Sequence, residues 1–196
     1  WMAFRSVLKP LPAQLGISSS AETKVCCLSE RMPLPSTLTR SLKTATKADI
    51  EIIKQAFVEK YSDAVTALSY RNDYELLIAI ILSAQCTDKR VNIITPALFE
   101  KYPSVRELAL ANLEDVQALL NTCSFFNNKA KNIIKMAQSV LSDYDGEIPH
   151  DQKKLMKLAG VGNKTANVFM IEFEGANLMA VDTHVFRVSH RLGLSD

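Results

Sequence analysis

Apolar residues recur along this chain mainly at intervals of three and four, the spacing of one face of an α-helix. The segment ADIEIIKQAFVEKY, residues 48–61, shows the pattern through Ile52, Ile53, Ala56 and Phe57. Strict alternation of apolar and polar residues, which would indicate strands, is hard to find. The pattern predicts about eight short helices, over residues 48–61, 72–85, 88–103, 112–123, 128–146, 151–159, 163–175 and 182–193. We therefore expect an all-α fold.

The segment NDYELLIAIILSAQ, residues 72–85, is apolar on nearly every side, which predicts a helix buried at the centre of the core. Asn72 or Asp73 can cap its start, since short polar side chains accept hydrogen bonds from the first turn. Residues 83–88 are abruptly polar. A buried helix is therefore expected to end among polar residues.

Several single residues mark where helices begin, end or break. Pro96 predicts a break within 88–103, because proline lacks the N–H that a helix interior needs. SVRE, residues 104–107, has the spacing of a capping box. Gly146 suits a helix C-terminus, and Asp182 suits a helix N-cap.

Residues 1–46 do not show the composition of a folded domain. They hold four of the seven prolines, many serines and threonines, and little periodicity. A basic, serine-rich, acid-poor leader is typical of an organellar transit peptide. A disordered or non-native extension is the alternative, and the sequence leaves both open.

The formal net charge of +2 conceals an uneven distribution. Residues 1–49 hold seven basic and three acidic side chains, whereas residues 50–196 hold sixteen and eighteen. The body of the chain is therefore not basic. If it binds nucleic acid, it does so through a local patch or backbone amides and not through its overall field.

The four cysteines form no C-x-x-C pair and no regular framework, which favours a reduced, intracellular setting. That setting is the cytoplasm or nucleoid if the source is bacterial, with organellar or nuclear targeting by the leader as the alternative. The longest apolar run, residues 76–82, is far too short to span a bilayer. We expect no membrane partner and no metal ligated within this chain.

The segment LAGVGNKTAN, residues 158–167, admits three interpretations. A Walker-type phosphate loop is excluded, because that motif needs G-x-x-x-x-G-K after a strand, and here Asn163 separates Gly162 from the lysine. A plain turn between two helices is the second interpretation. The third is a helix-hairpin-helix, in which Gly160 and Gly162 let the backbone approach a phosphate that the next helix binds by its free N–H groups.

Lys164 changes the balance between the last two interpretations. It lies in the first turn of the predicted helix 163–175, where the helix dipole disfavours a cation. A lysine kept at such a position suggests a chemical task. A neutral primary amine is a nucleophile that can form a Schiff base.

Four separated motifs give the chain a resemblance to a known family. LAGVGNKTANV and AVDTHVFRVSHRLGL, residues 158–168 and 180–194, closely resemble the endonuclease III family of helix-hairpin-helix DNA glycosylases. LLIAIILSAQCTDKRVN and NNKAKNI, residues 76–92 and 127–133, are similar to the same family in the same order. The resemblance covers roughly residues 48–196.

The resemblance implies the family fold and its domains. That fold has a six-helix barrel-like domain and a second helical domain built from both ends of the chain. Here it implies a first helix within 47–70 that belongs with the second domain, a barrel over 71–175 that includes the helix-hairpin-helix at 151–174, and a partial second domain over 176–196.

The resemblance also implies an activity, which is removal of oxidised pyrimidines from DNA followed by cleavage at the abasic site. Lys164 matches the family's catalytic lysine, which attacks the deoxyribose and leaves an imine. Asp182 matches the catalytic aspartate, which activates the lysine and stabilises positive charge. A simple N-cap is the structural alternative for Asp182, and the two roles are compatible.

Further positions match residues that meet DNA in the family. Gln85 matches a side chain that enters the duplex where a base has left the stack, and Phe125 matches a second, apolar wedge between bases. A helix terminus for Gln85, core packing for Phe125 and Phe126, and an ordinary polar helix residue for His184 are the alternatives. Asp88 belongs either near a substrate pocket or at a helix cap. The full predicted DNA-binding set is Gln85, Phe125, Gly160, Val161, Gly162, Thr165 and His184.

Two departures from the family pattern matter. Ala159 stands where the family hairpin often has proline, which should loosen the turn modestly. The family also continues past the position of Asp196, commonly with four closely spaced cysteines that hold a 4Fe-4S cluster. We therefore expect a C-terminally truncated chain that encodes no cofactor ligand, with a cluster only if the full-length protein carries that loop.

The sequence thus predicts a monomeric DNA repair enzyme whose partner is double-stranded DNA with a damaged pyrimidine or an abasic site. A catalytically impaired DNA-binding fragment of the same family is the first alternative. A relative with another base preference, such as adenine, is the second, and Lys164 argues against it.

Overall fold

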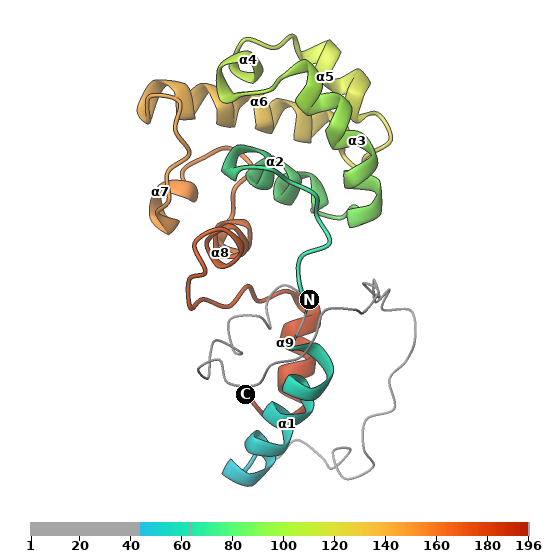
Figure 1. Ribbon diagram of the computed structural model, residues 1–196, viewed down its shortest axis with the longest axis vertical. Helices are drawn as coiled ribbons and strands as arrows, with labels where there is room; N and C mark the ends of the chain where they lie inside the picture. Colours follow the sequence, from blue (N-terminus) through green and yellow to red (C-terminus); the bar gives the residue numbers. More distant parts are fainter. Residues whose placement is uncertain (1–43, 63, 196) are drawn as a thin grey trace, which may run out of the picture. The chain divides into compact units, whose positions relative to one another are not determined.

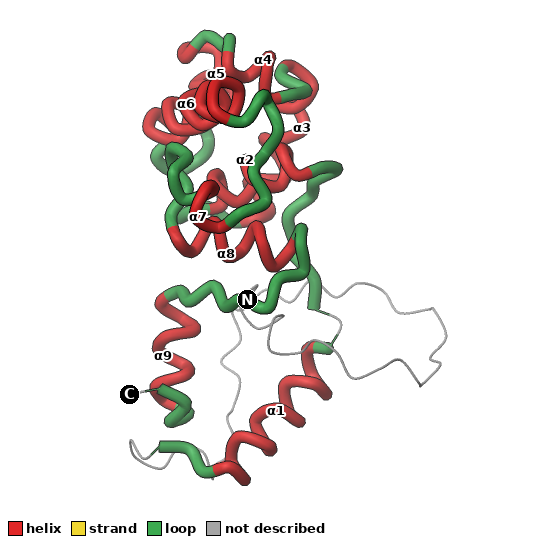
Figure 2. The backbone as a smooth tube through the Cα atoms, turned by 90° about the vertical axis from the view of Figure 1, so that its left-hand side faces the viewer, coloured by secondary structure: helices red, strands yellow, loops and turns green. Residues whose placement is uncertain are grey.

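The computed structural model describes residues 44–62 and 64–195 of the 196-residue chain, and within them the structure is helical with no strand (Figures 1 and 2). This confirms the all-α prediction. Residues 1–43 of the predicted leader lie outside the described residues. The helices are α1 Lys47–Tyr61, α2 Asp73–Ser83, α3 Asp88–Lys101, α4 Val105–Ala109, α5 Leu113–Leu120, α6 Phe126–Asp143, α7 Gln152–Leu155, α8 Asn163–Glu172 and α9 Thr183–Arg191.

The chain divides into two compact units. The larger unit is Thr66–Ala180 and contains α2 to α8. The smaller unit contains α1 and α9, from the described residues 44–62, 64–65 and 181–195. None of the helices in the described part of the chain has the length and apolar character needed to cross a membrane.

Helix α2 is the centre of the larger unit, as its composition predicts. Every residue from Tyr74 to Leu82 is buried, and α2 packs against α3, α6 and α8. Figures 1 and 2 show it between the group α4–α6 and the pair α7–α8. Asn72 is the N-cap that accepts a hydrogen bond from the backbone N of Glu75 at 2.9 Å.

Glu75 is a charged residue inside this apolar core, with only 2% of its side chain surface exposed. Its carboxylate accepts hydrogen bonds of 2.8 Å from the backbone N and from Nε of Arg71. A buried carboxylate is tolerated only when it is paired and hydrogen-bonded. The Arg71 contact therefore fixes the segment that leads into α2.

The predicted break at Pro96 is wrong, because α3 continues through the proline to Lys101. Proline removes one backbone hydrogen bond, but the side chains on both sides of it are buried in the core, among them Val91, Ile94 and Leu98. Their packing keeps the helix continuous.

Two elements also differ from the predicted ones, since α4 lies outside the eight predicted ranges and α7 is shorter than predicted. Helix α4, residues Val105–Ala109, was indicated only by its capping residues, because five residues are too few to show a helical period. Helix α7 spans only four residues of the predicted 151–159, and the chain then continues in turns toward Gly160.

The smaller unit joins the start of α1 to the end of α9. Thr46 and Asp49 form a complete capping box at the N-terminus of α1, and the backbone N of Ala45 donates to the carbonyl oxygen of Gly193 at 2.8 Å. Ile53 of α1 and Val185 of α9 are its buried helix residues.

The burial of α2 generates a stability prediction. Leu77→Ala should lower the free energy of unfolding of the larger unit by about 2–5 kcal/mol, since the side chain is fully buried and leaves a cavity. Ile93→Ala, at a position 61% exposed, is the control and should change it by no more than ~0.5 kcal/mol. Urea denaturation followed by circular dichroism measures both, and equal effects would contradict the central role of α2.

Candidate functional site

The turn between α7 and α8 contains two glycines, and its geometry requires glycine at the first of them, Gly160. Gly160 has a φ of +80°, which side chains rarely adopt. A Cβ there would also lie 3.0 Å from Cβ of Asn132 in α6. The side chain of Val161 is buried, and its backbone N–H donates to the carbonyl oxygen of Leu158 at 3.1 Å. The turn is thus packed closely against α6.

Gly162 differs from Gly160, because nothing inside the protein requires a glycine there. Its φ is −91°, and a Cβ would meet no atom within 4 Å. It is the N-cap of α8 and has no side chain to accept the N–H groups of the first turn. Gly162 therefore leaves open space at the start of a helix.

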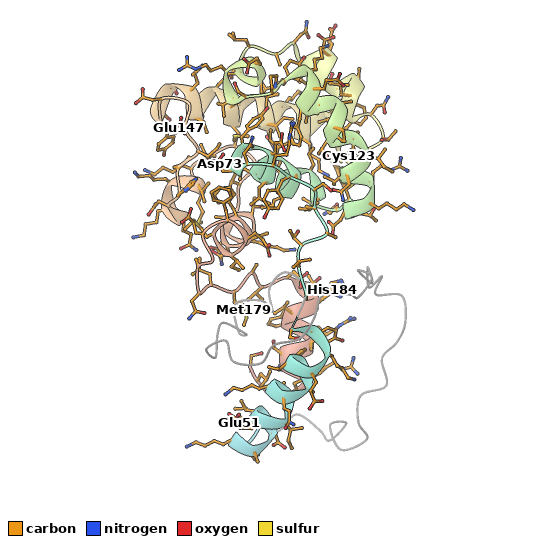
Figure 3. All side chains as sticks on the ribbon, viewed as in Figure 1. Glu51, Asp73, Cys123, Glu147, Met179 and His184 are labelled. Carbon is orange, nitrogen blue, oxygen red and sulfur yellow. The ribbon has the colours of Figure 1, made fainter. Side chains whose placement is uncertain are left out.

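A polar network holds α7 against α8. Nε2 of Gln152 donates to Oδ1 of Asn167 at 2.5 Å and to Oδ1 of Asn163 at 3.2 Å. Nδ2 of Asn167 donates to the carbonyl oxygen of Met179 at 2.9 Å, on the segment that follows α8 (Figure 3). Because these amides are satisfied by one another and by the backbone, the two helices of the hairpin have a defined orientation.

Lys164 and Thr165 are the second and third residues of α8, directly after this open turn. Lys164 is exposed and Thr165 is half-buried. The hairpin thus presents an amine at the surface, within one helical turn of Gly162. The predicted position of Lys164 in the first turn of the helix is confirmed.

Gln85 and Phe125 share an unusual backbone conformation. Their φ values are +54° and +57°, and only one other non-glycine residue in the described chain, Asp145, has a positive φ. Left-handed backbone is strained for a residue with a large side chain, and such strain concentrates at functional sites. Both residues are exposed, Phe125 by 64%. Core packing is therefore wrong for Phe125, whereas Phe126 is half-buried.

The structure brings the loops of Gln85 and Phe125 together through a residue that sequence reasoning missed. Nζ of Lys129, in α6, donates to the carbonyl oxygens of Leu82 at 2.8 Å and Ala84 at 2.6 Å. It also contacts Sγ of Cys123 at 3.3 Å, in the loop before Phe125 (Figure 3 labels Cys123). The sequence held one signal, a lysine among the apolar residues of an amphipathic helix.

Two N-termini stand apart from the others in the described part of the chain. Seven helices have an N-cap side chain that accepts a hydrogen bond from the first turn. Helices α6 and α8 have none, since their N-caps are Phe125 and Gly162. First-turn N–H groups without a side-chain cap are suited to bind an anion such as phosphate. The N-cap of each of these two helices is a residue predicted to contact DNA.

Asp182 and His184 belong to the smaller unit. Oδ1 of Asp182 accepts hydrogen bonds from the backbone N of His184 at 3.0 Å and of Val185 at 2.8 Å. The predicted N-cap position is therefore confirmed. Asp182 is half-buried and His184 is exposed at the start of α9 (Figure 3). Lys164 lies in the larger unit.

Asp88 is the first residue of α3 and does not cap it. Thr87 is the N-cap, and its hydroxyl accepts from the backbone N of Arg90 at 3.3 Å. Partial burial raises the pKa of the Asp88 carboxyl. Of the two roles predicted for Asp88, the helix cap is wrong, and proximity to a substrate pocket stays a prediction.

The described residues do not fit an iron–sulfur cluster. Their cysteines are Cys86 and Cys123, and they contain no group of three or more side chains able to hold a metal ion. Such a cluster needs four thiolates arranged around it. Cys26 and Cys27 lie outside the described residues.

Comparison with known proteins places this chain in a family. Residues 78–196 match the model of the HhH-GPD superfamily base excision DNA repair protein. Endonuclease III of Synechocystis sp. is 45% identical over 69% of this chain and 62% of that protein. Endonuclease III of Bacillus subtilis is 43% identical over 74% of this chain and 66% of that protein. The chain thus spans about two thirds or less of the length of these relatives.

Solved structures agree with this match. A structure of a non-covalent endonuclease III–DNA complex is 43% identical, with a TM-score of 0.74 and coverage of 78% of this chain and 72% of that one. A thermostable thymine-DNA glycosylase, 23% identical with a TM-score of 0.65 over 72% of this chain and 67% of that one, shares the fold. The chain belongs to the HhH-GPD superfamily of base excision DNA repair proteins, and within it to the endonuclease III family.

The two glycines of the hairpin give a matched pair of predictions. Gly160→Ala should lower the free energy of unfolding by about 1–3 kcal/mol, because alanine is strained at this φ and its methyl group meets Asn132. Gly162→Ala should change it by less than ~0.5 kcal/mol, since a weaker N-cap offsets the reduced entropy of the unfolded chain. Thermal denaturation of both variants measures this, and a reversed order would contradict the described turn.

Proposed function

We propose that this chain is a bifunctional DNA glycosylase that removes oxidised pyrimidines and then cleaves the strand at the abasic site. The observation that carries the proposal is Lys164, an exposed lysine in the first turn of α8, whose N-cap Gly162 is open and provides no side-chain cap. This arrangement combines a site for a phosphate with a nucleophile beside it. Family membership supports the same activity.

In the proposed function, the hairpin binds the DNA backbone. An added methyl group at Gly162 would contact nothing in the protein, so the space there is available to a phosphate. The N–H groups of the first turn of α8 then donate to its oxygens. Binding of this kind is independent of base sequence, as a repair enzyme that scans DNA requires.

The two strained residues provide access to the damaged base. A base inside the stack cannot be reached, so it must leave the duplex. Gln85 presents an exposed amide that can enter the duplex where the base has departed, and Phe125 presents an exposed apolar ring that can wedge between bases. The backbone strain at both positions is consistent with side chains held ready to enter DNA.

Lys164 and Asp182 supply the chemistry. The amine of Lys164 attacks carbon 1′ of the deoxyribose, a C–N bond forms, and the bond to the damaged base breaks, so that the base leaves with a proton. Opening of the sugar ring gives an imine, which acidifies the proton on carbon 2′. Loss of that proton expels the 3′ phosphate by β-elimination. Asp182 assists by accepting a proton from the amine and stabilising positive charge on the sugar.

The partner in this proposal is double-stranded DNA with a damaged pyrimidine or an abasic site, and the protein acts as a monomer. One structural relative is described as a trapped endonuclease III–DNA covalent intermediate, which is the kind of species that the proposed lysine chemistry forms. No step of the proposal uses a metal or a cluster.

Borohydride trapping on a duplex with one abasic site tests the role of Lys164. Borohydride reduces an imine to a stable protein–DNA crosslink, so the parent chain should crosslink and Lys164→Gln should not. Lys157→Gln removes an exposed lysine from the same hairpin and should keep most of the crosslink. If the parent chain is folded and binds this DNA but forms no crosslink, the catalytic proposal is wrong and only DNA binding remains.

A conservative change separates the two roles of Asp182. Asparagine caps a helix about as well as aspartate, so Asp182→Asn should change the free energy of unfolding by less than ~0.5 kcal/mol. The same variant should slow base removal by about 10²–10⁴-fold, because it removes the charge and the proton acceptor. Single-turnover cleavage of a duplex with an oxidised pyrimidine measures the rate. An unchanged rate would show that Asp182 acts only as a helix N-cap.

A further inference from the structure

Lys129 is a charged side chain buried in the larger unit, with 7% of its surface exposed. Among the described residues no carboxylate forms an ion pair with it. Its amino group instead meets three acceptors, the carbonyl oxygens of Leu82 and Ala84 and the sulfur of Cys123. The three N–H donors of a lysine ammonium are therefore matched by three acceptors.

The two carbonyl groups belong to the C-terminal end of α2. The last carbonyl groups of a helix have no partner within it, and the negative end of the helix dipole lies there. Leu82 is buried, so its carbonyl group needs a donor from the protein, whereas Ala84 is exposed. Lys129 supplies both the hydrogen bonds and the opposite charge.

Lys129 also bonds to the second loop through its own backbone. Its N–H donates to the carbonyl oxygen of Phe125 at 3.1 Å. One residue thus bonds to Phe125 with its main chain and to Ala84, the neighbour of Gln85, with its side chain. Cys123, in the loop before Phe125, also contacts the end of α2, because its Sγ lies 3.6 Å from the carbonyl oxygen of Leu82. Burial raises the pKa of the Cys123 thiol.

We propose that Lys129 is a positioning residue that holds the Gln85 and Phe125 loops side by side, so that both side chains can enter DNA in one binding step. This rests on the proposed function, which assigns those two residues to the duplex. A loop that is already ordered loses less entropy on binding. Two strained residues remain in place only where the surrounding structure determines their conformation, and the Lys129 bonds are part of that structure.

Hydrogen exchange in the free protein tests the holding role without any DNA. Lys129→Met keeps the length of the side chain and removes its charge and donors. Amides within residues 83–88 and 121–127 should exchange about tenfold faster in this variant, while those of the α2 interior keep their rates. Lys135→Met changes an exposed lysine of the same helix and should leave both loops unchanged.

Fluorescence of 2-aminopurine tests insertion into DNA. The probe base is placed opposite a tetrahydrofuran abasic-site analogue, so that unstacking by an inserted side chain increases its emission. Lys129→Met should lose most of this increase and bind the analogue about tenfold more weakly. Lys135→Met should match the parent chain in both respects.

A double-variant comparison separates positioning from general stability. If Lys129 acts through Phe125, the loss of affinity in Lys129→Met combined with Phe125→Ala should be smaller than the sum of the two single losses. Additive losses, or parent-like exchange in both loops, would overturn the proposal. If Lys129→Met does not fold, Lys129→Gln keeps two N–H donors and replaces it in each measurement.

The outcomes distinguish failure of this proposal from failure of the proposed function. A parent chain that gives no 2-aminopurine signal and no borohydride crosslink shows that the proposed function is wrong, and hydrogen exchange still decides whether Lys129 holds the loops. A parent chain that gives both, beside a Lys129→Met variant that behaves identically, contradicts only the positioning role.

Discussion

The last carbonyl groups of a buried helix need hydrogen-bond donors from the protein, and at the end of α2 Lys129 provides them. This contact decides where the core of the larger unit meets the surface. Helix α2 is buried as far as Leu82, and a charged side chain from α6 closes its final turn. The loop that follows carries Gln85 and begins from a fixed point.

Helix α6 links the three segments of the larger unit that are predicted to contact DNA. Phe125 is its N-cap, Lys129 reaches the end of α2, and Asn132 lies against Gly160 of the hairpin. These positions are three or four residues apart, so they follow one another along one side of the helix. A single rigid element therefore fixes the relative positions of the loops and the hairpin within the larger unit.

Much of the site could be predicted from the sequence, because its residues lie in short segments with local signals. The glycine turn, Lys164 after it and Asp182 as an N-cap are all of this kind. The break predicted at Pro96 is wrong. Proline disfavours a helix interior, but packing of the side chains on both sides of Pro96 keeps α3 continuous. Lys129 was missed, because nothing in a helical pattern reveals which distant carbonyl groups a lysine will meet.

The sequence by itself determined the helical class of this protein, the buried character of α2 and the family to which the chain belongs. Periodicity and short motifs express these properties over a few consecutive residues. Only the tertiary structure decided that Gly160 must be glycine against Asn132 while Gly162 faces open space. It alone placed the strained Gln85 and Phe125 on loops joined through Lys129, because contacts between residues some 45 positions apart depend on how helices pack and not on local pattern.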